Sequence, residues 1–501
     1  MSGRTKLATV LAISALVAAP TATASAAEPA GPALAKKLSK KVTVEGVNRH
    51  LIAFQRIADR NGGTRAALTP GYDASVDYVA GKLRDEGFIV TTPTFSYEIN
   101  VNDAETARVD GVNYQALIMV ASPQTPAGGV TGPLRVVPED AGTGCEASDF
   151  AGQDFTGSVA LIRRGGCTFE QKHLNAHAAG AIAVLVSNNT AGPLSDVTLT
   201  NPGKIPTGGI SQADGTTLAG KAGSAVTVDM RFHSETRTER NVIAQTRTGR
   251  TNNVVMAGAH LDSVELGAGI NDNGTGSAAL LETALQLGSR PKVDNAVRFA
   301  WWGAEERGLI GSEEWVRSLT FEQQLDIALY LNFDMVGSPN AAYFIYDGDN
   351  SDGVGAGPGP FGSAQIEKAF ADYFAAKGVP TEGTDFSGRS DYGEFIAQGI
   401  PAGGLFTGAE GVKTAAQAAK WGGTAGVAYD PCYHAACDSL GNVDRVALGR
   451  NAGAIAFVTA AYGVSTEDVN GVPPRSKRAE ARAAAKMSLT AHEDHSHAAV
   501  S

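Results

Sequence analysis

The chain has 501 residues, and this length predicts roughly two to four domains or modules rather than one compact domain. Hydrophobic residues make up 43% of the chain and charged residues 19%, a globular composition that excludes global disorder. The 41 basic and 52 acidic side chains give a formal net charge of -11, which argues against a nucleic-acid-binding protein.

Residues 1–27 have the pattern of a secretory signal peptide. Arg4 and Lys6 precede an apolar run over residues 7–19, and small residues follow at 24–27. The run is shorter than the roughly 20 residues that a membrane span needs, and no later stretch of the sequence is long and apolar enough to span a bilayer. We therefore expect a secreted, extracellular protein with no membrane association.

The N-terminal part of the mature chain begins with two predicted helices and a strand. Apolar residues recur at helical spacing from Val47 to Ala58. A second helix is expected over residues 72–86. Gly87 follows it and is expected to end it, because glycine readily adopts the left-handed conformation of a helix C-cap. The apolar residues 88–90 then predict a strand.

Residues 125–235 are rich in Gly, Pro and short apolar strands such as 158–162. His173 and His177 could share a helix face, but no acidic partner completes a metal motif, so we expect them to be structural or surface residues. The segment resembles the protease-associated domain that is inserted into many exported peptidases, most clearly over residues 157–188. This resemblance implies a lid, or a modulator of substrate or partner binding.

The four cysteines are an even number in a chain that we expect to be exported, and oxidising conditions favour their pairing. Proximity in the sequence predicts the disulfides Cys145–Cys167 and Cys432–Cys437, the second of which closes a very small loop. A zinc site is the alternative for a cysteine cluster. Neither pair has CxxC spacing, and an exported thiolate is easily oxidised, so we favour the disulfides.

From Asn241 the sequence alternates buried strands with helices, which predicts a largely parallel sheet covered by helices on both faces. The predicted strands are 254–257, 297–301, 329–333 and 400–406, and the predicted helices are 274–287 and 309–319. We expect residues 40–124 and 236–464 to form one α/β domain, a three-layer sandwich with a mostly parallel central sheet. The β-rich segment 125–235 would be inserted into it.

Residues 465–501 differ again in composition. Pro473 and Pro474 precede a stretch rich in Ala, Arg and Glu, and three histidines follow, namely His492, His495 and His497. We expect a disordered or processed extension, with weak metal loading by the histidines as the alternative.

Metal-binding residue types follow three predicted strands, and open α/β sheets place ligand sites just beyond the carboxyl ends of their strands. A further carboxylate lies in a turn that leads into a helix, and a further imidazole lies beside the small cysteine loop. The five candidate ligands are His260, Asp272, Glu306, Asp334 and His434.

Imidazole and carboxylate ligands suit zinc, and two zinc ions roughly 3.5 to 4 Å apart can clamp both oxygens of a tetrahedral centre. If Asp272 bridges the two ions, His260 and Asp334 can complete one site while Glu306 and His434 complete the other. Three carboxylates and one bridging hydroxide then balance the charge of two Zn²⁺ ions.

Glu305 and Glu306 are adjacent, so their side chains point in different directions on an extended strand end. We expect Glu306 to bind metal and Glu305 to act as general base toward the bridging water, passing the proton to the leaving amine. The alternative for a Glu-Glu pair is a solvated surface patch. The buried strand before it, which ends in Trp301 and Trp302, argues against that alternative.

Residues 252–442 resemble the co-catalytic two-zinc aminopeptidases, and closely the secreted actinobacterial leucine aminopeptidases of that family. The resemblance implies the same five zinc ligands, Glu305 as the base and Asp262 as a residue that orients the ligands. It also implies a cis peptide bond between Asp272 and Asn273. The matching runs are 258–263, 269–287, 298–306, 330–338, 403–408, 420–426 and 432–440.

The same resemblance suggests residues for substrate binding. Tyr433 matches a tyrosine that hydrogen-bonds the developing oxyanion, and Arg389 matches an arginine near the backbone and carboxylate end of the substrate. Met335 and Phe406 match residues that line an apolar specificity pocket. The implied substrates are peptides that carry a free N-terminus and a large apolar first residue such as Leu.

The sequence departs from the family pattern at one binding site. Gly449 and Gly453 stand where the secreted relatives have calcium-binding aspartates, so we predict no calcium site.

A carboxypeptidase or dipeptidase of the same two-metal architecture is the first alternative function. A metal-free binding protein with the peptidase fold is the second, although the intact ligand set argues against it. A monomer is the default for a secreted enzyme of this type.

Overall fold

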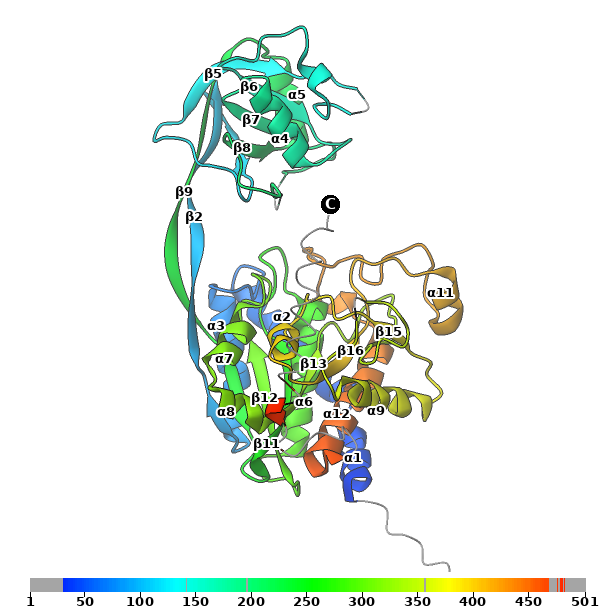
Figure 1. Cartoon of the computed structure of the whole chain (residues 1–501). Coiled ribbons are helices and arrows are strands. Elements are labelled where there is room, and N and C mark those ends of the chain that lie inside the picture. Colours follow the sequence, from blue (N-terminus) through cyan, green and yellow to red (C-terminus); the bar gives the residue numbers. More distant parts are fainter. Residues whose placement is uncertain are drawn as a thin grey trace, which may run out of the picture.

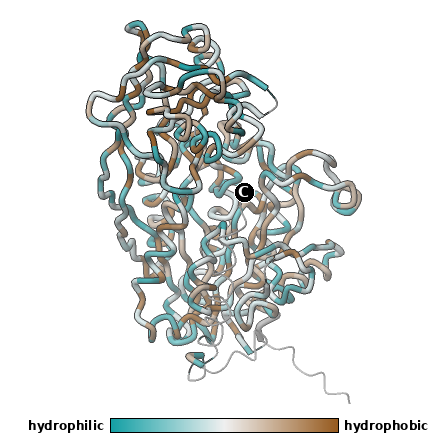
Figure 2. Tube along the Cα trace, turned by 45° about the horizontal axis from the view of Figure 1, so that its top comes forward, coloured by the Kyte–Doolittle hydropathy of each residue, from teal (hydrophilic) through white to brown (hydrophobic). Residues whose placement is uncertain are grey.

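The computed structural model describes residues 30–467, apart from 141, 195, 196 and 356, together with residues 475, 478–480 and 482. The expected signal peptide and the tail histidines lie outside the described residues. Each of two sheets has eight strands, one in a large body and one in an insert that lies above it in Figure 1. Hydrophobic stretches gather inside both units (Figure 2).

The body sheet is mixed at its edges and parallel at its centre, as the sequence predicts. Strands β12, β11, β13 and β16 run parallel to one another and correspond to the four strands expected in this half of the chain. Their residues are almost all buried, which explains their nearly continuous apolar sequences. In spatial order the strands are β1 (Ile89–Thr91), β10 (Val242–Gln245), β12 (Asn295–Trp302), β11 (Arg250–His260), β13 (Ile327–Phe333), β16 (Ala402–Phe406), β14 (Phe344–Tyr346) and β15 (Glu382–Thr384).

Helices cover both faces of this sheet, so the three-layer sandwich is confirmed. Alternate residues of β11 contact the two helical layers, Val255 and Ala257 on one side and Met256 on the other. The first layer contains α1 (Ala30–Lys41), α2 (Val44–Arg60), α3 (Pro70–Asp85), α6 (Gly276–Leu287), α9 (Ser363–Ala375) and α12 (Arg445–Val464). The second contains α7 (Ile310–Ser318), α8 (Phe321–Asp326) and α10 (Gly393–Ala397), and α11 (Ala415–Trp421) lies at the periphery.

Helix α1 was not expected, because four of its 12 residues are lysines and Pro32 lies near its start. It forms because Ala35 and Leu38, one turn apart, are buried in the core that α12 also enters. The next helix, α2, begins where the hydroxyl of Thr43 accepts a hydrogen bond from the N–H of Gly46.

The insert has its own sheet and a small helical layer. Its strands β5 to β8 run parallel to one another, and the predicted apolar run 158–162 forms β6. The antiparallel strands come from both ends of the insert. In spatial order the strands are β3 (Val112–Gln115), β2 (Thr94–Val109), β9 (Ala225–Arg240), β5 (Val130–Val136), β6 (Val159–Arg163), β7 (Ala183–Ser187), β8 (Thr207–Ile210) and β4 (Leu117–Ile118). The helices are α4 (Phe169–Ala178) and α5 (Gln212–Ala219). Short 3-10 turns occur at Ala147–Phe150 in the insert and at Leu440–Asn442 in the body.

The expected start of the insert at residue 125 is therefore too late, since β3 and β4 already belong to the second sheet. The reason is the long ribbon of β2 and β9, which pair from Thr94↔Arg240 to Val109↔Val226 and connect the two units (Figure 1). At 3.2–3.4 Å per residue such a strand spans about 50 Å. Because its two strands are distant in the sequence, no local pattern marks where the insert begins.

Both predicted disulfides are present, Cys145–Cys167 in the insert and Cys432–Cys437 in the body. His173 is buried, and its ring accepts from the N–H of Lys204 and contacts the hydroxyl of Thr207, so it is a structural residue as expected. His177, on the same helix, is exposed.

Eight residues of the predicted tail 465–501 are described, namely 465–467, 475, 478–480 and 482. The last five are helical, which does not fit the expected disorder, and Arg478 and Arg482 are buried with hydrogen bonds to the carbonyl groups of Leu325 and Ile327. Arginine side chains that reach backbone carbonyls hold this segment against α8 and β13.

None of the described helices has both the length and the hydrophobicity that a membrane crossing requires.

Candidate active site

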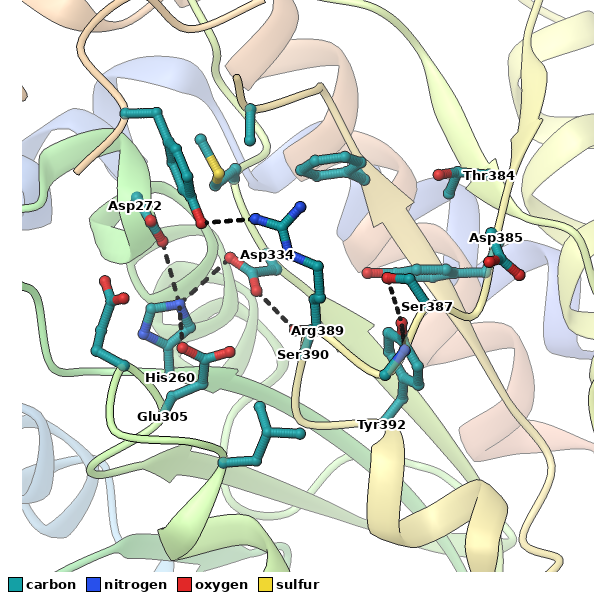
Figure 3. A pocket seen from close by; sticks show the side chains of 18 of the residues that line it. His260, Asp272, Glu305, Asp334, Thr384, Asp385, Ser387, Arg389, Ser390 and Tyr392 are labelled. Atoms are coloured by element: carbon teal, nitrogen blue, oxygen red, sulfur yellow. Dashed lines mark hydrogen bonds and ion pairs between the residues drawn. The ribbon is translucent and has the colours of Figure 1, made fainter. Parts of the chain in front are cut away.

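The carboxyl ends of β11, β12 and β13 meet at one edge of the body sheet, where a pocket of about 410 Å³ opens (Figure 3). His260 ends β11, Glu305 follows β12 by three residues, and Asp334 follows β13 directly. Ligand sites are expected at such an edge. The sequence-predicted residues that line the pocket are His260, Asp272, Glu305, Glu306, Asp334, Met335, Arg389, Phe406, Tyr433 and His434.

Asp272 lies between two imidazoles. Its Oδ1 is 3.2 Å from Nε2 of His260, and its Oδ2 is 3.3 Å from Nε2 of His434. The residue belongs to the tight turn Ile270–Thr275, which precedes helix α6, and the peptide bond to Asn273 is cis, as the resemblance implies. One carboxylate therefore faces both halves of the site.

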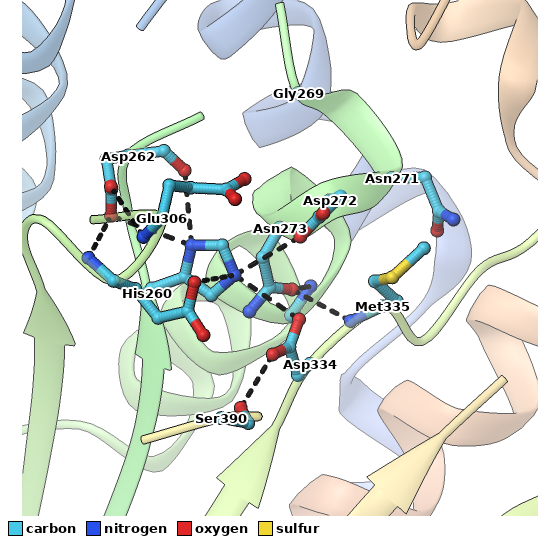
Figure 4. Close-up of polar contacts among 12 residues, drawn as sticks. His260, Asp262, Gly269, Asn271, Asp272, Asn273, Glu306, Asp334, Met335 and Ser390 are labelled. Carbon is cyan, nitrogen blue, oxygen red and sulfur yellow. Dashed lines mark hydrogen bonds and ion pairs between the residues drawn. The ribbon is translucent and has the colours of Figure 1, made fainter. Parts of the chain in front are cut away.

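Each imidazole has a second carboxylate partner. Nε2 of His260 lies 3.3 Å from Oδ1 of Asp334, and Nε2 of His434 lies 2.9 Å from Oε2 of Glu306. Two clusters result, joined by Asp272. Figure 4 shows His260, Asp272 and Asp334 of the first cluster. Each cluster contains one imidazole and one carboxylate of its own, which is the division that the sequence predicts.

Glu305 lies at the edge of the first cluster, with its Oε2 3.8 Å from Nε2 of His260. The side chain is buried, and burial raises its pKa well above the usual glutamate value. Behind it, the carboxylate of Asp262 accepts hydrogen bonds from the backbone N–H groups of Glu305 and Glu306, at 3.2 and 3.3 Å. Asp262 also approaches Nδ1 of His260 at 3.6 Å, so it orients residues of both clusters.

The crowded carboxylates change the pKa values of the site. Burial and the charge of Asp272 raise the pKa of Glu306 to about 7. Burial alone would lower the pKa of His434, but hydrogen bonds to Asp272 and Glu306 outweigh it and raise the pKa to about 10. The pKa of His260 likewise lies well above its usual value, because Glu305 and Asp334 outweigh the effect of burial. The pocket thus favours positive charge at both imidazoles.

The donor set fits metal ions. Ligand atoms of His260, Asp272 and Glu306 lie within 4.8 Å of one another, and so do those of His260, Glu305 and Asp334. Oε1 of Glu306 and Oδ1 of Asp334 are buried but accept no hydrogen bond from any described residue. Buried carboxylate oxygens without a donor are costly, and a cation between the clusters would satisfy them.

Strained backbone occurs at three places in the site. Ala304, Met335 and His434 have φ angles of 53°, 46° and 53°, in the left-handed region that non-glycine residues rarely adopt. Each lies at, or next to, a candidate ligand or base. Such strain clusters at functional sites, where the surrounding structure holds it.

The predicted substrate-binding residues line the same pocket as the candidate ligands. Arg389 donates a 3.1 Å hydrogen bond to the hydroxyl of Tyr433 and forms a 2.7 Å ion pair with Glu410 (Figure 3). Met335 and Phe406 provide apolar surface beside these polar groups.

The sequence reasoning missed three residues that support the site. Ser390 donates a 2.6 Å hydrogen bond to Oδ2 of Asp334 (Figure 4). Asp438 and Arg65 hold the backbone around Asp272. Asp438 lies next to Cys437 and Ser390 next to Arg389, so adjacency to residues already singled out was an available signal for these two. Arg65 carries no such signal.

Comparisons with known proteins agree with this geometry. Residues 241–459 match peptidase family M28, and residues 130–218 match the PA domain. The chain is 46% identical to the probable lipoprotein aminopeptidase LpqL of Mycobacterium tuberculosis, over 90% of this chain and 91% of that protein. It is 47% identical to an aminopeptidase of Pseudomonas aeruginosa, with 86% and 83% covered, and 44% identical to the probable leucine aminopeptidase 2 of Aspergillus fumigatus, with 84% of each chain covered.

Two solved structures share the fold over most of the chain. The zinc aminopeptidase BSAP from Bacillus subtilis gives a TM-score of 0.65 at 25% identity, covering 86% of this chain and 96% of that one. The aminopeptidase from Aneurinibacillus sp. strain AM-1 gives 0.59 at 27% identity, with 85% and 95% covered. With its relatives and its pocket of imidazoles and carboxylates, this chain belongs to peptidase family M28 and is an aminopeptidase with an inserted PA domain.

Proposed function

We propose that the protein is a secreted aminopeptidase that uses two zinc ions to remove large apolar residues, such as Leu, from the N-termini of peptides. The observation that carries this proposal is the position of Asp272, whose two carboxylate oxygens face the different imidazoles of His260 and His434. A carboxylate in this position can serve two metal ions at once.

In this proposal, His260 and Asp334 would hold one zinc ion, Glu306 and His434 would hold the other, and Asp272 would serve both. Imidazole nitrogen and carboxylate oxygen are established zinc ligands. Zinc held there would supply Lewis acidity toward the substrate carbonyl and would lower the pKa of water. The zinc aminopeptidase from Bacillus subtilis, which has the same fold, supports the choice of metal.

Glu305 is the general base in this account. It accepts a proton from the attacking water and passes it to the amine that leaves when the peptide bond breaks. Burial keeps its pKa above the usual glutamate value, which favours the return of the proton. The backbone hydrogen bond from Glu305 to Asp262 fixes the position of the base beside His260.

Tyr433 and Arg389 act on the substrate. The hydroxyl of Tyr433 can donate to the carbonyl oxygen on which negative charge develops. The guanidinium of Arg389 contacts that hydroxyl and holds the far side of the substrate. Burial raises the pKa of Tyr433 above the usual tyrosine value. The hydroxyl therefore keeps its proton at neutral pH and remains a donor.

The proposed preference for large apolar first residues depends on Met335 and Phe406, which offer apolar surface in the same pocket as the carboxylates. The carboxylates attract the free α-amino group, so a peptide with a blocked N-terminus should bind poorly. The relative named a probable leucine aminopeptidase is consistent with this preference.

Secretion is supported by the leader-like residues 1–27 and by the two disulfides, which persist in oxidising compartments. We propose that the enzyme acts as a monomer, and size-exclusion chromatography with light scattering would test this.

The test measures the amino acids, leucine and glycine, that are released from Leu-Gly-Gly and from N-acetyl-Leu-Gly-Gly, before and after chelation and after zinc is restored. Metal-dependent cleavage of the free-amine peptide alone is the expected result. Cleavage of the blocked peptide from its other end would indicate a carboxypeptidase. Absence of metal-dependent cleavage of either peptide would contradict the proposal.

A further inference from the structure

Arg65 is a fully buried arginine that lies behind the site, on the segment between α2 and α3. Its Nε donates to the carbonyl oxygen of Ala268 at 2.8 Å, and its Nη2 donates to that of Gly269 at 2.6 Å. Its Nη1 donates to the carbonyl oxygen of Leu261, which follows the ligand His260. One side chain therefore binds the backbone of two ligand-bearing segments.

The charge of Arg65 is retained in this interior position. Burial lowers its pKa to about 10, so the guanidinium is protonated at neutral pH, and carboxylates that include Asp262 and Asp438 stabilise that charge. The guanidinium also lies 5.0 Å from the ring centre of Phe54. A buried charge requires partners of this kind, and the planar fork of arginine can reach three carbonyls where an ammonium group could not.

Asp438 contacts the same loop from the other side. Its Oδ1 accepts from the N–H of Asn271 at 2.8 Å, and its Oδ2 accepts from the N–H of Asp272 at 3.0 Å. The side chain is 2% exposed and follows Cys437, so the disulfide loop that carries His434 supplies this contact.

The loop of residues 268–272 is thus held from two sides. The guanidinium of Arg65 binds its carbonyl groups at 268 and 269, and the carboxyl group of Asp438 binds its N–H groups at 271 and 272. Hydrogen bonds with a charged partner, such as those of the guanidinium, are roughly twice as strong as those between neutral groups. The carboxylate that faces both imidazoles lies at the end of this loop, so its place depends on these contacts.

We propose that Arg65 and Asp438 are positioning residues that clamp the loop 268–272 from two sides and thereby fix the carboxylate of Asp272 where it can serve two metal ions. The clamp rests on the proposed function, because its purpose is the bridging role of Asp272. A misplacement of about 1 Å in a catalytic group can cost about 100-fold in rate, which is the effect that the clamp prevents.

The experiment compares Arg65→Lys and Asp438→Asn with the wild-type chain. Lysine keeps the charge but carries its three donors on one nitrogen, so it lacks the planar fork that reaches three separate carbonyls. Asparagine keeps the size of Asp438 but replaces one of its two acceptor oxygens with an NH2 group. The control is Arg298→Lys, because Arg298 is a half-buried arginine on β12 whose hydrogen bonds go to Gln245, away from the pocket. Folding is checked by circular dichroism. Zinc dissociation constants are measured by chelator competition. The values of kcat and KM are measured by steady-state kinetics with Leu-Gly-Gly as substrate.

The clamp predicts folded Arg65→Lys and Asp438→Asn chains whose zinc dissociation constants rise by about 10–100-fold, the usual cost of losing a residue that orients metal ligands. It also predicts a fall in kcat with little change in KM, since neither residue lines the substrate pocket. The control should lose thermal stability alone.

Zinc affinity and kcat equal to wild type in both variants would overturn the clamp and leave Arg65 and Asp438 as residues of stability only. If Arg65→Lys does not fold, Asp438→Asn decides the matter by the same measurements. A wild-type chain that binds no zinc and releases no leucine would overturn the proposed function, and the clamp with it, so the two failures are distinguishable.

Discussion

Nε2 of His434 lies 2.9 Å from Oε2 of Glu306, and this contact connects the small disulfide loop to the end of strand β12. The side chain of His434 is 41% exposed, whereas that of His260 is 1% exposed. The two halves of the site therefore differ in their contact with solvent, and the half that contains His434 is the outer one.

His434→Ala should consequently lose one zinc ion and keep the other, because His260, Asp272 and Asp334 remain in place. We expect activity to fall further than the roughly 10–100-fold that loss of an orienting residue costs. Metal analysis of the purified variant, together with leucine release, checks both expectations. A variant that retains both ions at full activity would remove His434 from the ligand set.

Glu305→Gln should retain its zinc but lose most of its turnover, because glutamine cannot accept the proton of the attacking water. General base catalysis contributes about 10²–10⁴-fold, so kcat should fall by that factor. Zinc content and kcat are measured on the same preparation. Near-normal kcat with bound zinc would show that the proton is accepted elsewhere.

Tyr433→Phe should lower kcat by about 10²–10³-fold, the usual cost of removing one donor to a developing oxyanion. Tyr429→Phe is the matched control, because Tyr429 lies in the same segment but donates its hydroxyl hydrogen bond to Gln417. Steady-state kinetics on both variants separate the two effects. Equal kcat values for both variants and wild type would exclude an oxyanion role for Tyr433.

We expect the free energy of unfolding to depend on pH because Glu239 is buried. Burial raises its pKa to about 7, and its Oε1 accepts from the N–H of Leu68 while its Oε2 has no partner among the described residues. The folded chain therefore binds more protons than the unfolded chain between the usual glutamate pKa and pH 7. In that window the free energy of unfolding falls as pH rises, by about 3 kcal/mol in all.

Glu239→Gln removes this titration, because glutamine stays neutral. The variant should match the wild type near pH 4 and exceed its melting temperature above pH 7. Thermal unfolding of both chains across this range measures the difference. A constant difference in melting temperature at every pH would show that Glu239 does not titrate as its burial implies.

The sequence predicts most of the body and its site because their signals are local. One buried apolar strand ends in His260, and Asp334 directly follows another. Glu305 and Glu306 are adjacent after a third strand, so their side chains point in different directions and are expected to have different roles. Strand ends in a parallel sheet meet at one edge, so these positions suffice to bring the candidate ligands together.

The parts that could not be predicted depend on contacts between distant segments. The ribbon of β2 and β9 pairs residues 94–109 with 225–240, and nothing in either strand identifies its partner. Arg65 follows two glycines and a threonine, a context typical of a surface turn, yet it is buried because the carbonyls of Leu261, Ala268 and Gly269 surround it.

The proposed function requires Asp272 to bridge two zinc ions. A crystal structure of the zinc-loaded protein, with anomalous diffraction recorded at the zinc absorption edge, tests this bridge. Two peaks roughly 3.5 to 4 Å apart are expected, one beside His260 and Asp334 and one beside Glu306 and His434, with one oxygen of Asp272 on each. A single peak, or two peaks with Asp272 bound to neither, would contradict it.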